Sequence, residues 1–155
     1  MKSIKLSLKK ILIIFTVFLC TKTQSQSIYL ELLGKGVVNS INYEHHLSKR
    51  ISGFNAQLGI GFAPSSLVTI PASINYVFGK RNHHLELGAG LTYINGYLWV
   101  DDDRLGPEVG VHLNLLYRYQ KPEGRYFYKA GFTPFVARGI GTWFGVGVGY
   151  SFRSI

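Results

Sequence analysis

The sequence predicts an all-β protein, an eight-stranded antiparallel up-and-down transmembrane β-barrel. Three observations support this fold class. Segments of about ten residues alternate apolar with polar or glycine residues, and such alternation is the primary sequence signal of a strand. A secretory signal pattern precedes these segments, and no segment combines helical periodicity with helix caps.

The N-terminus predicts a signal peptide over residues 1–25. Lysines come first, an apolar run over 11–19 follows, and Thr23 and Ser25 stand three and one residues before the expected cut. This order is typical of a secretory signal, whereas the apolar run is shorter than the roughly 20 residues of a membrane-spanning helix. Cleavage after Ser25 leaves one domain, residues 26–155.

Cys20 permits a second interpretation, a lipoprotein anchor, but Leu19 stands where that signal needs a small residue. This cysteine is the single one in the chain, so cleavage leaves neither a disulfide nor a thiolate metal site. Cleavage also removes Lys2, Lys5, Lys9, Lys10 and Lys22, which leaves 12 basic against 8 acidic residues and a net charge of +4. Much of the remaining basic charge lies in short connections, so we expect no nucleic-acid partner.

The first four predicted strands cover residues 28–33, 37–47, 54–62 and 68–78. Each sets an apolar face against a face of polar residues or glycine, as in the second, where Val37 and Ile41 oppose Ser40. Residues 34–36, Gly-Lys-Gly, are predicted to turn the chain, since glycine accepts positive φ. Pro71 cannot donate to a strand ladder, so it predicts a bulge or the rim end of the fourth strand.

The last four predicted strands cover residues 84–94, 109–120, 126–133 and 143–152. In the eighth, every second residue from Gly145 to Ser151 is glycine or serine. The connection over 95–108 is the longest, whereas those after the second, fourth and sixth strands are short and basic or turn-like. We therefore expect the long connection outside the cell and both termini in the periplasm.

Alternation alone does not say which face is inside, because a soluble calycin-type barrel has an apolar interior. Two features favour a membrane barrel with a polar interior. The polar face is rich in glycine and small residues, which fit the narrow lumen of eight strands. The apolar face carries aromatic residues near strand ends, as in the girdles of membrane barrels.

The whole mature chain resembles the small outer-membrane β-barrel proteins of Gram-negative bacteria, the group of OmpA-type and OmpX-type barrels. The most specific part is residues 145–152, which are similar to the C-terminal signal read by the barrel-assembly machinery, with Gly147, Tyr150 and Phe152 at matching positions. Gly145 stands where the family has a polar residue, and three residues follow the final aromatic one. The resemblance implies an outer-membrane location, contact with lipid and lipopolysaccharide, and recognition by the assembly machinery.

Catalytic and metal-binding patterns are mostly absent. The sequence has no GxSxG, HExxH or GxxxxGK[ST] motif. His46-Leu47-Ser48 resembles the His-x-Ser pair of outer-membrane lipid A deacylases, but the topology places it at a periplasmic strand end, away from the outer leaflet. Neighbouring histidines point to opposite faces of a strand, and Asp101-Asp102-Asp103 lacks the spacing of a calcium loop. We therefore expect no enzyme activity, metal or cofactor.

The polar face carries charged residues that the barrel must bury: Glu31, Glu44, Glu86, Glu108, Arg118 and Lys129. Buried charges persist only when they are paired, so we expect Glu44, Glu86, Arg118 and Lys129 to form one polar cluster that plugs the lumen. The predicted role is structural or surface-interacting, through loops 95–108 and 135–142. Two alternatives stay open, a narrow conduit for ions or small apolar solutes and a lipid-modifying enzyme; neither ligand nor oligomeric state is predicted.

Overall fold

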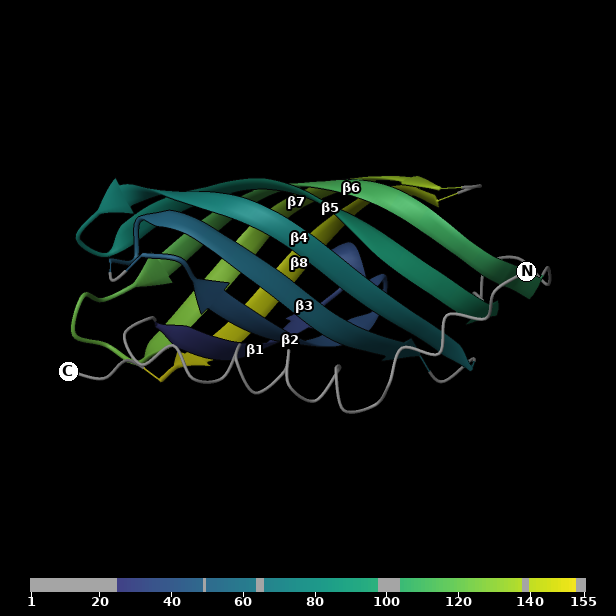
Figure 1. The fold of residues 1–155 in the computed structure, drawn as a ribbon, viewed down its shortest axis with the longest axis horizontal. Helices are drawn as coiled ribbons and strands as arrows, with labels where there is room; N and C mark the ends of the chain where they lie inside the picture. Colours follow the sequence, from purple (N-terminus) through teal and green to yellow (C-terminus); the bar gives the residue numbers. More distant parts are fainter. Residues whose placement is uncertain (1–24, 49, 64–65, 98–103, 138–139, 153–155) are drawn as a thin grey trace, which may run out of the picture.

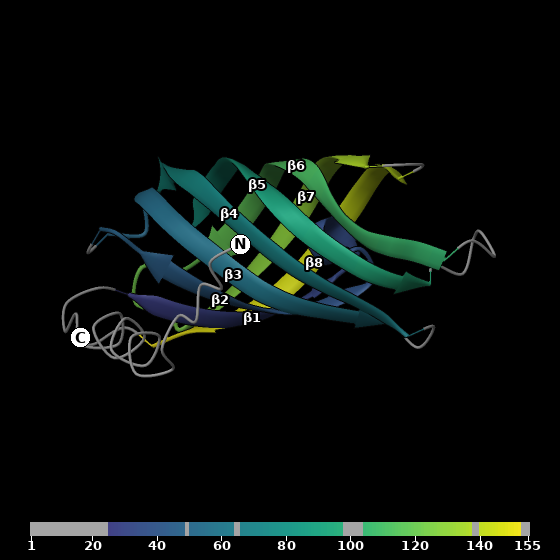
Figure 2. The ribbon, with the colours of Figure 1, turned by 45° about the vertical axis from the view of Figure 1, so that its right-hand side comes forward.

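The computed structural model describes residues 25–48, 50–63, 66–97, 104–137 and 140–152. They form eight strands, each antiparallel to the next along the chain, and β1 pairs with β8 to close the barrel (Figures 1 and 2). The strands are β1 Gln26–Leu32, β2 Asn39–His46, β3 Gly53–Ala63, β4 Leu67–Lys80, β5 His83–Tyr97, β6 Arg104–Gln120, β7 Tyr126–Ala137 and β8 Ile140–Ser151. The predicted eight-stranded up-and-down barrel is confirmed.

Within these ranges, no helix combines the length and the hydropathy that a membrane crossing requires. The predicted signal peptide lies outside the described residues except for its last residue, Ser25. Cys20, the residue of the lipoprotein interpretation, lies outside them as well.

Side chains alternate along the strands between a buried inner face and an exposed outer face. In β1, for example, Tyr29 and Glu31 are buried while Ile28 and Leu30 are exposed. The large apolar side chains on the outer surface retain 38% to 74% of their accessible area, and the interior is filled chiefly by polar side chains. This arrangement is the reverse of a soluble barrel, so the predicted assignment of the two faces is right.

Glycine on the inner face makes room for large side chains in the lumen. A Cβ atom at Gly149 would lie 2.3 Å from Cζ of Phe127 and 2.5 Å from Cβ of Tyr29. Both rings are buried and contact each other edge to face, with their centroids 5.9 Å apart. The alternating glycines of β8 therefore leave space for aromatic rings from β1 and β7.

The connection between β1 and β2 does more than turn the chain, as residues 34–36 were predicted to do. Residues 33–38, here called the inward connection, include the 3-10 turn η1 Gly34–Gly36 and enter the lumen, where Lys35 and Val37 are fully buried. Val37, predicted on the outer face of the second strand, lies inside because β2 begins only at Asn39. Leu33 and Val37 have φ of 61° and 72°, a strained conformation for residues that are not glycine.

The two predicted surface loops are largely strand. β5 continues to Tyr97 and β6 starts at Arg104, so most of 95–108 belongs to a hairpin, and 135–142 is likewise divided between β7 and β8. The β5–β6 register shifts between Ile94 and Gly96, and a similar shift interrupts the β7–β8 ladder. These irregularities interrupt the strand pairing near the points where the period-two pattern predicted the strands to end.

Pro71 marks neither a bulge nor the rim of β4. It is the fifth residue of β4, pairs with Thr92 of β5, and is buried. The register to β3 is the same on both sides of it, with Leu58 opposite Ala72 and Gly61 opposite Thr69. The ladder to β3 has a gap at the proline, and the strand continues past it without a bulge.

Candidate functional site

The barrel lumen brings together the four charged residues predicted to meet there, Glu44 on β2, Glu86 on β5, Arg118 on β6 and Lys129 on β7. Nη1 of Arg118 lies 2.5 Å from Oε1 of Glu44 and 3.8 Å from Oε2 of Glu86. Nζ of Lys129 lies 2.5 Å from Oε2 of Glu44 and 2.8 Å from Oε2 of Glu86. Each cation thus faces both carboxylates, and we call the four residues the lumen cluster.

Glu44 is the centre of the lumen cluster. Besides its two cations, it contacts Nε2 of His46 at 2.5 Å and accepts a hydrogen bond of 2.9 Å from the side-chain amide of Gln57. Its side chain is fully buried, so these partners replace its entire hydration shell. A buried carboxylate is stable only with this kind of complete compensation.

Gln57 lies on the predicted polar face of its strand, but its contacts with the lumen cluster were not predicted. Its Nε2 donates to Glu44 and, at 2.5 Å, to Oε1 of Glu86, while its Oε1 accepts from Nζ of Lys35 at 2.8 Å and from the Tyr29 hydroxyl at 2.8 Å. The amide therefore presents its donor to the carboxylates and its acceptor to the lysine. The available signal was its register, since Gln57 lies directly opposite Glu44 on the inner face.

Aromatic rings complete the surroundings of the buried cations. The Arg118 guanidinium lies 4.1 Å from the centroid of Phe127, and Nζ of Lys129 lies 4.5 Å from the centroid of Tyr29. Cations over aromatic faces gain electrostatic stabilisation, and the gain is larger where water is excluded.

The inward connection adds a second polar layer to the lumen, between the lumen cluster and the end of the barrel where β1 ends. Lys35 donates to the Tyr29 hydroxyl and to Gln57, and its Nζ lies 3.6 Å from Oε2 of Glu31. The hydroxyls of Thr69 and Thr92 donate to the carbonyls of Gly36 and Lys35, each at 3.0 Å.

Two glycines on different walls leave room for the inward connection. A Cβ at Gly61 of β3 would lie 2.8 Å from the Gly36 carbonyl oxygen, and a Cβ at Gly145 of β8 would lie 3.0 Å from Cα of Gly34. Gly145 is the position at which the sequence departs from the pattern of the barrels that it resembles. In this chain the inward connection occupies the space that a side chain at position 145 would take.

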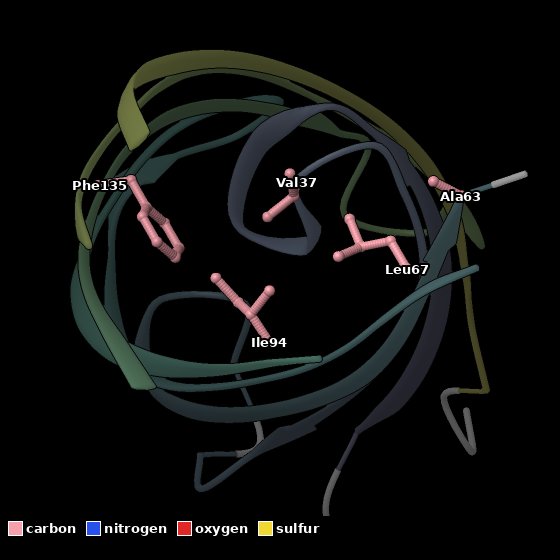
Figure 3. Close-up of a cluster of buried hydrophobic side chains, with 5 residues drawn as sticks. All are labelled: Val37, Ala63, Leu67, Ile94 and Phe135. Carbon is pink, nitrogen blue, oxygen red and sulfur yellow. The ribbon is translucent and has the colours of Figure 1, made fainter. Parts of the chain in front are cut away.

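An apolar cap covers the end of the lumen that holds the inward connection. It consists of the buried side chains Val37, Ala63, Leu67, Ile94 and Phe135. Figure 3 shows Val37 on the curled connection inside the barrel, with the other side chains arranged around it on the walls. The cap and the two polar layers therefore occupy the lumen from this end to its middle.

The six Lys, Arg, Glu and Asp side chains buried among the described residues balance in charge. Lys35, Arg118 and Lys129 face Glu31, Glu44 and Glu86. Glu108, which was also predicted to point inward, is half-buried and has an interaction partner. This balance fits a packed interior more closely than a water-filled channel of one charge.

His46 and Ser48, the pair that resembles a deacylase motif, have separate partners. The His46 ring contacts Glu44 inside the lumen, whereas the Ser48 hydroxyl accepts a hydrogen bond of 3.3 Å from the backbone N–H of Arg50. Over the described part of the chain, no three His, Cys, Asp or Glu side chains gather as metal ligands do. Residues Asp101–Asp103 lie outside the described residues.

The three residues predicted as an assembly signal lie where β8 closes the barrel. Gly147 pairs with Glu31 of β1 and Tyr150 with Ile28, while Phe152 follows the strand and its N–H donates to the Gln26 carbonyl at 2.7 Å. The Tyr150 and Phe152 rings contact each other, with centroids 5.2 Å apart. Both aromatic side chains therefore lie at the end of the closing strand.

Comparisons with known proteins match the fold. No protein-family model matches the chain, and no curated protein sequence matches it. Its structure is similar to the crystal structure of the N-terminal β-barrel domain of Pseudomonas aeruginosa OprF, with a TM-score of 0.58 and 17% sequence identity. The match covers 83% of this chain and 96% of that domain. The predicted resemblance to this type of barrel is thus confirmed at the level of the fold.

Proposed function

We propose that the protein is an outer-membrane β-barrel with a closed polar lumen and a structural or surface-interacting role. The observation that carries the proposal is the inverted barrel, in which an exposed apolar outer face surrounds a buried, charge-balanced interior. An apolar band on the outside of a closed barrel suits a bilayer, because closure leaves no unpaired strand edge in the lipid. The likeness to the OprF barrel domain supports the same conclusion.

Surface contacts in this proposal belong to hairpin ends rather than to long loops. β5 and β6, at 15 and 17 residues, are the longest of the described strands, and their hairpin ends on the side opposite the ends of β1 and β8 that lie nearest the termini. The proposed orientation places this hairpin outside the cell, in contact with lipopolysaccharide, and both termini in the periplasm. The role is non-enzymatic, with no cofactor.

The closed lumen predicts an electrically silent protein. In planar bilayers, the reconstituted wild-type barrel should give no steady single-channel conductance, because polar side chains and the apolar cap fill the interior. A stable channel in the wild type would contradict the proposed closed state.

The strained inward connection favours a second candidate, a narrow conduit that opens when the connection leaves the lumen. The matched variant replaces residues 33–38 with Asn-Gly, which joins the paired residues Leu32 and Asn39 by a two-residue hairpin turn. Ion conductance in this variant alone would support the conduit. Silence in both proteins would mean that the lumen cluster is sufficient to close the barrel.

Recognition by the barrel-assembly machinery is tested at Phe152. Phe152→Ala should lower the amount of folded protein in the outer membrane of cells, measured by heat-modifiable gel migration, while Arg153→Ala should leave it unchanged. Refolding into lipid vesicles without the machinery separates recognition from stability. Equal levels of Phe152→Ala and wild type in cells would contradict a signal at this position, and an equal defect in vesicles would assign Phe152 to packing.

A further inference from the structure

Exposed basic side chains form a ring at the end of the barrel where β1 starts and β8 ends. The ring lies on the three connections at this end and on the last residue of β4, and its members are Arg50, Lys80, Arg81, Lys121 and Arg125. Glu123 is the one acidic residue among the described residues of these connections. We call the five residues the basic collar; the end of the barrel that carries it, where β1 starts and β8 ends, is at the left of Figure 1.

Hydrogen bonds join the three connections into a continuous rim. The Ser52 hydroxyl donates to the Gly79 carbonyl at 2.8 Å, and the N–H of Gln120 donates to the Asn82 carbonyl at 2.9 Å. Arg125 closes the rim, since its carbonyl accepts from the N–H of Ser151 at 2.7 Å. The barrel therefore sets the backbone positions from which the basic side chains extend. A shallow hollow beside Lys121 lies between Asn82 and residues 121–124.

A belt of aromatic side chains lies next to the basic collar on the outer face. Its members contact one another in three groups: Phe54, Tyr76 and Phe78; His83, Tyr117 and Tyr119; and Tyr126, Tyr150 and Phe152. Aromatic belts of membrane proteins lie at the level of the lipid headgroups. Lys80 and Lys121 each stand two residues beyond a belt residue, or about 7 Å along the strand.

We propose that the basic collar binds anionic phospholipid headgroups in the leaflet that the aromatic belt contacts. The proposal rests on the proposed function, which places the barrel in a bilayer. Charge complementarity identifies the partner class, because several cations on one rim attract phosphate-bearing anionic lipids. The belt favours lipid over cell wall, since it keeps the cations at headgroup depth rather than beyond the membrane. No comparable group of exposed basic side chains occurs among the described residues of the opposite end.

The Arg125 side chain links the two features directly. Its Nη1 donates to the Tyr150 hydroxyl of the aromatic belt at 2.9 Å. The guanidinium is thereby held against a belt residue and can still donate from its remaining N–H groups to a phosphate. For this reason Arg125 is left unchanged in the test below, because its substitution would also disturb the belt.

The test measures lipid selectivity of the reconstituted barrel in vesicles of phosphatidylcholine containing phosphatidylglycerol. Spin-labelled forms of the two lipids report their relative association with the protein. The neutralised variant carries Arg50→Gln, Lys80→Gln, Arg81→Gln and Lys121→Gln. The matched control exchanges the same residues with retention of charge, as Arg50→Lys, Lys80→Arg, Arg81→Lys and Lys121→Arg.

Wild type and the charge-retaining control should prefer phosphatidylglycerol at low salt, and neutralisation should reduce this preference at least about fivefold, the factor that about 1 kcal/mol from a single basic residue gives. High salt should weaken the preference of the wild type in the same direction. Equal association of both lipids with the wild type, in a barrel that inserts normally, would overturn this inference and leave the proposed function intact. Failure of the wild-type barrel to insert into these vesicles would overturn both this inference and the proposed function. Loss of binding to isolated cell wall without a change in lipid preference would assign the basic collar to the cell wall instead.

Discussion

Replacing Glu44 with Gln is expected to destabilise the barrel by about 3–5 kcal/mol, the cost of leaving buried charge uncompensated. The substitution keeps the shape of the side chain but removes the charge that Arg118 and Lys129 contact at 2.5 Å. Both cations then share only Glu86, from which Arg118 is 3.8 Å distant. The free energy of unfolding, measured by urea titration of the reconstituted barrel, reports the loss.

Glu123→Gln is the matched control, because Glu123 is exposed on a connection and its loss should change stability very little. A double-mutant cycle separates the pairs inside the lumen. The double variant with Glu44→Gln and Arg118→Gln should lose less free energy of unfolding than the two single variants lose in sum, because the two residues are in direct contact. The corresponding cycle for Glu86 and Arg118 should show a smaller coupling at the longer distance. Additive losses for Glu44 and Arg118 would contradict the lumen cluster.

Leu113→Arg is expected to make the free energy of folding into bilayers less favourable by about 2–4 kcal/mol. This is the cost of a basic side chain deep in the apolar band of a membrane barrel. Leu113 is 54% exposed on the outer face of β6. It pairs with Ala89 of β5 near the middle of both strands. In a membrane this exposed surface contacts hydrocarbon, which cannot solvate a guanidinium. The measurement is the fraction of protein that migrates as the folded, heat-modifiable form after mixing with lipid vesicles.

Leu47→Arg is the control for depth. Leu47 is exposed to a similar extent but lies on the connection after β2, three residues before Arg50 of the basic collar. An arginine there remains at the interface, where its cost is about 0–1 kcal/mol. Equal insertion of the two variants would show that the outer face of the barrel does not contact hydrocarbon, and the proposed membrane location would fail.

Local alternation predicted the fold well where the strands are regular. In β3, the residues from Asn55 to Phe62 alternate between the lumen and the outer surface as the sequence indicates. The prediction failed where the backbone departs from regular pairing. The register shift near Gly96 interrupts the pairing, and the predicted fifth strand stopped at Ile94 although β5 continues to Tyr97.

The sequence predicted which four charged residues form the lumen cluster, but not which neighbours contact them. Charged residues on the inner face of a narrow barrel must pair with one another, which predicted that Glu44, Glu86, Arg118 and Lys129 would meet. The sequence did not indicate that Gln57 joins them, because a neutral amide on a polar face carries no charge that demands a partner. Nor did it indicate Lys35, because a lysine between two glycines is typical of a surface turn.

The sequence by itself determined the closed eight-stranded barrel, its polar interior and its apolar exterior. These follow from a period of two that repeats along the chain, a property that each segment carries locally. Only the tertiary structure decided how the lumen is closed. Whether residues 33–38 turn outward or enter the barrel depends on the space left by Gly61 and Gly145, which lie on strands distant in sequence. This space exists only after the walls have closed, because backbone from both sides of the barrel bounds it. The inward connection fills the space and accepts hydrogen bonds there from Thr69 and Thr92.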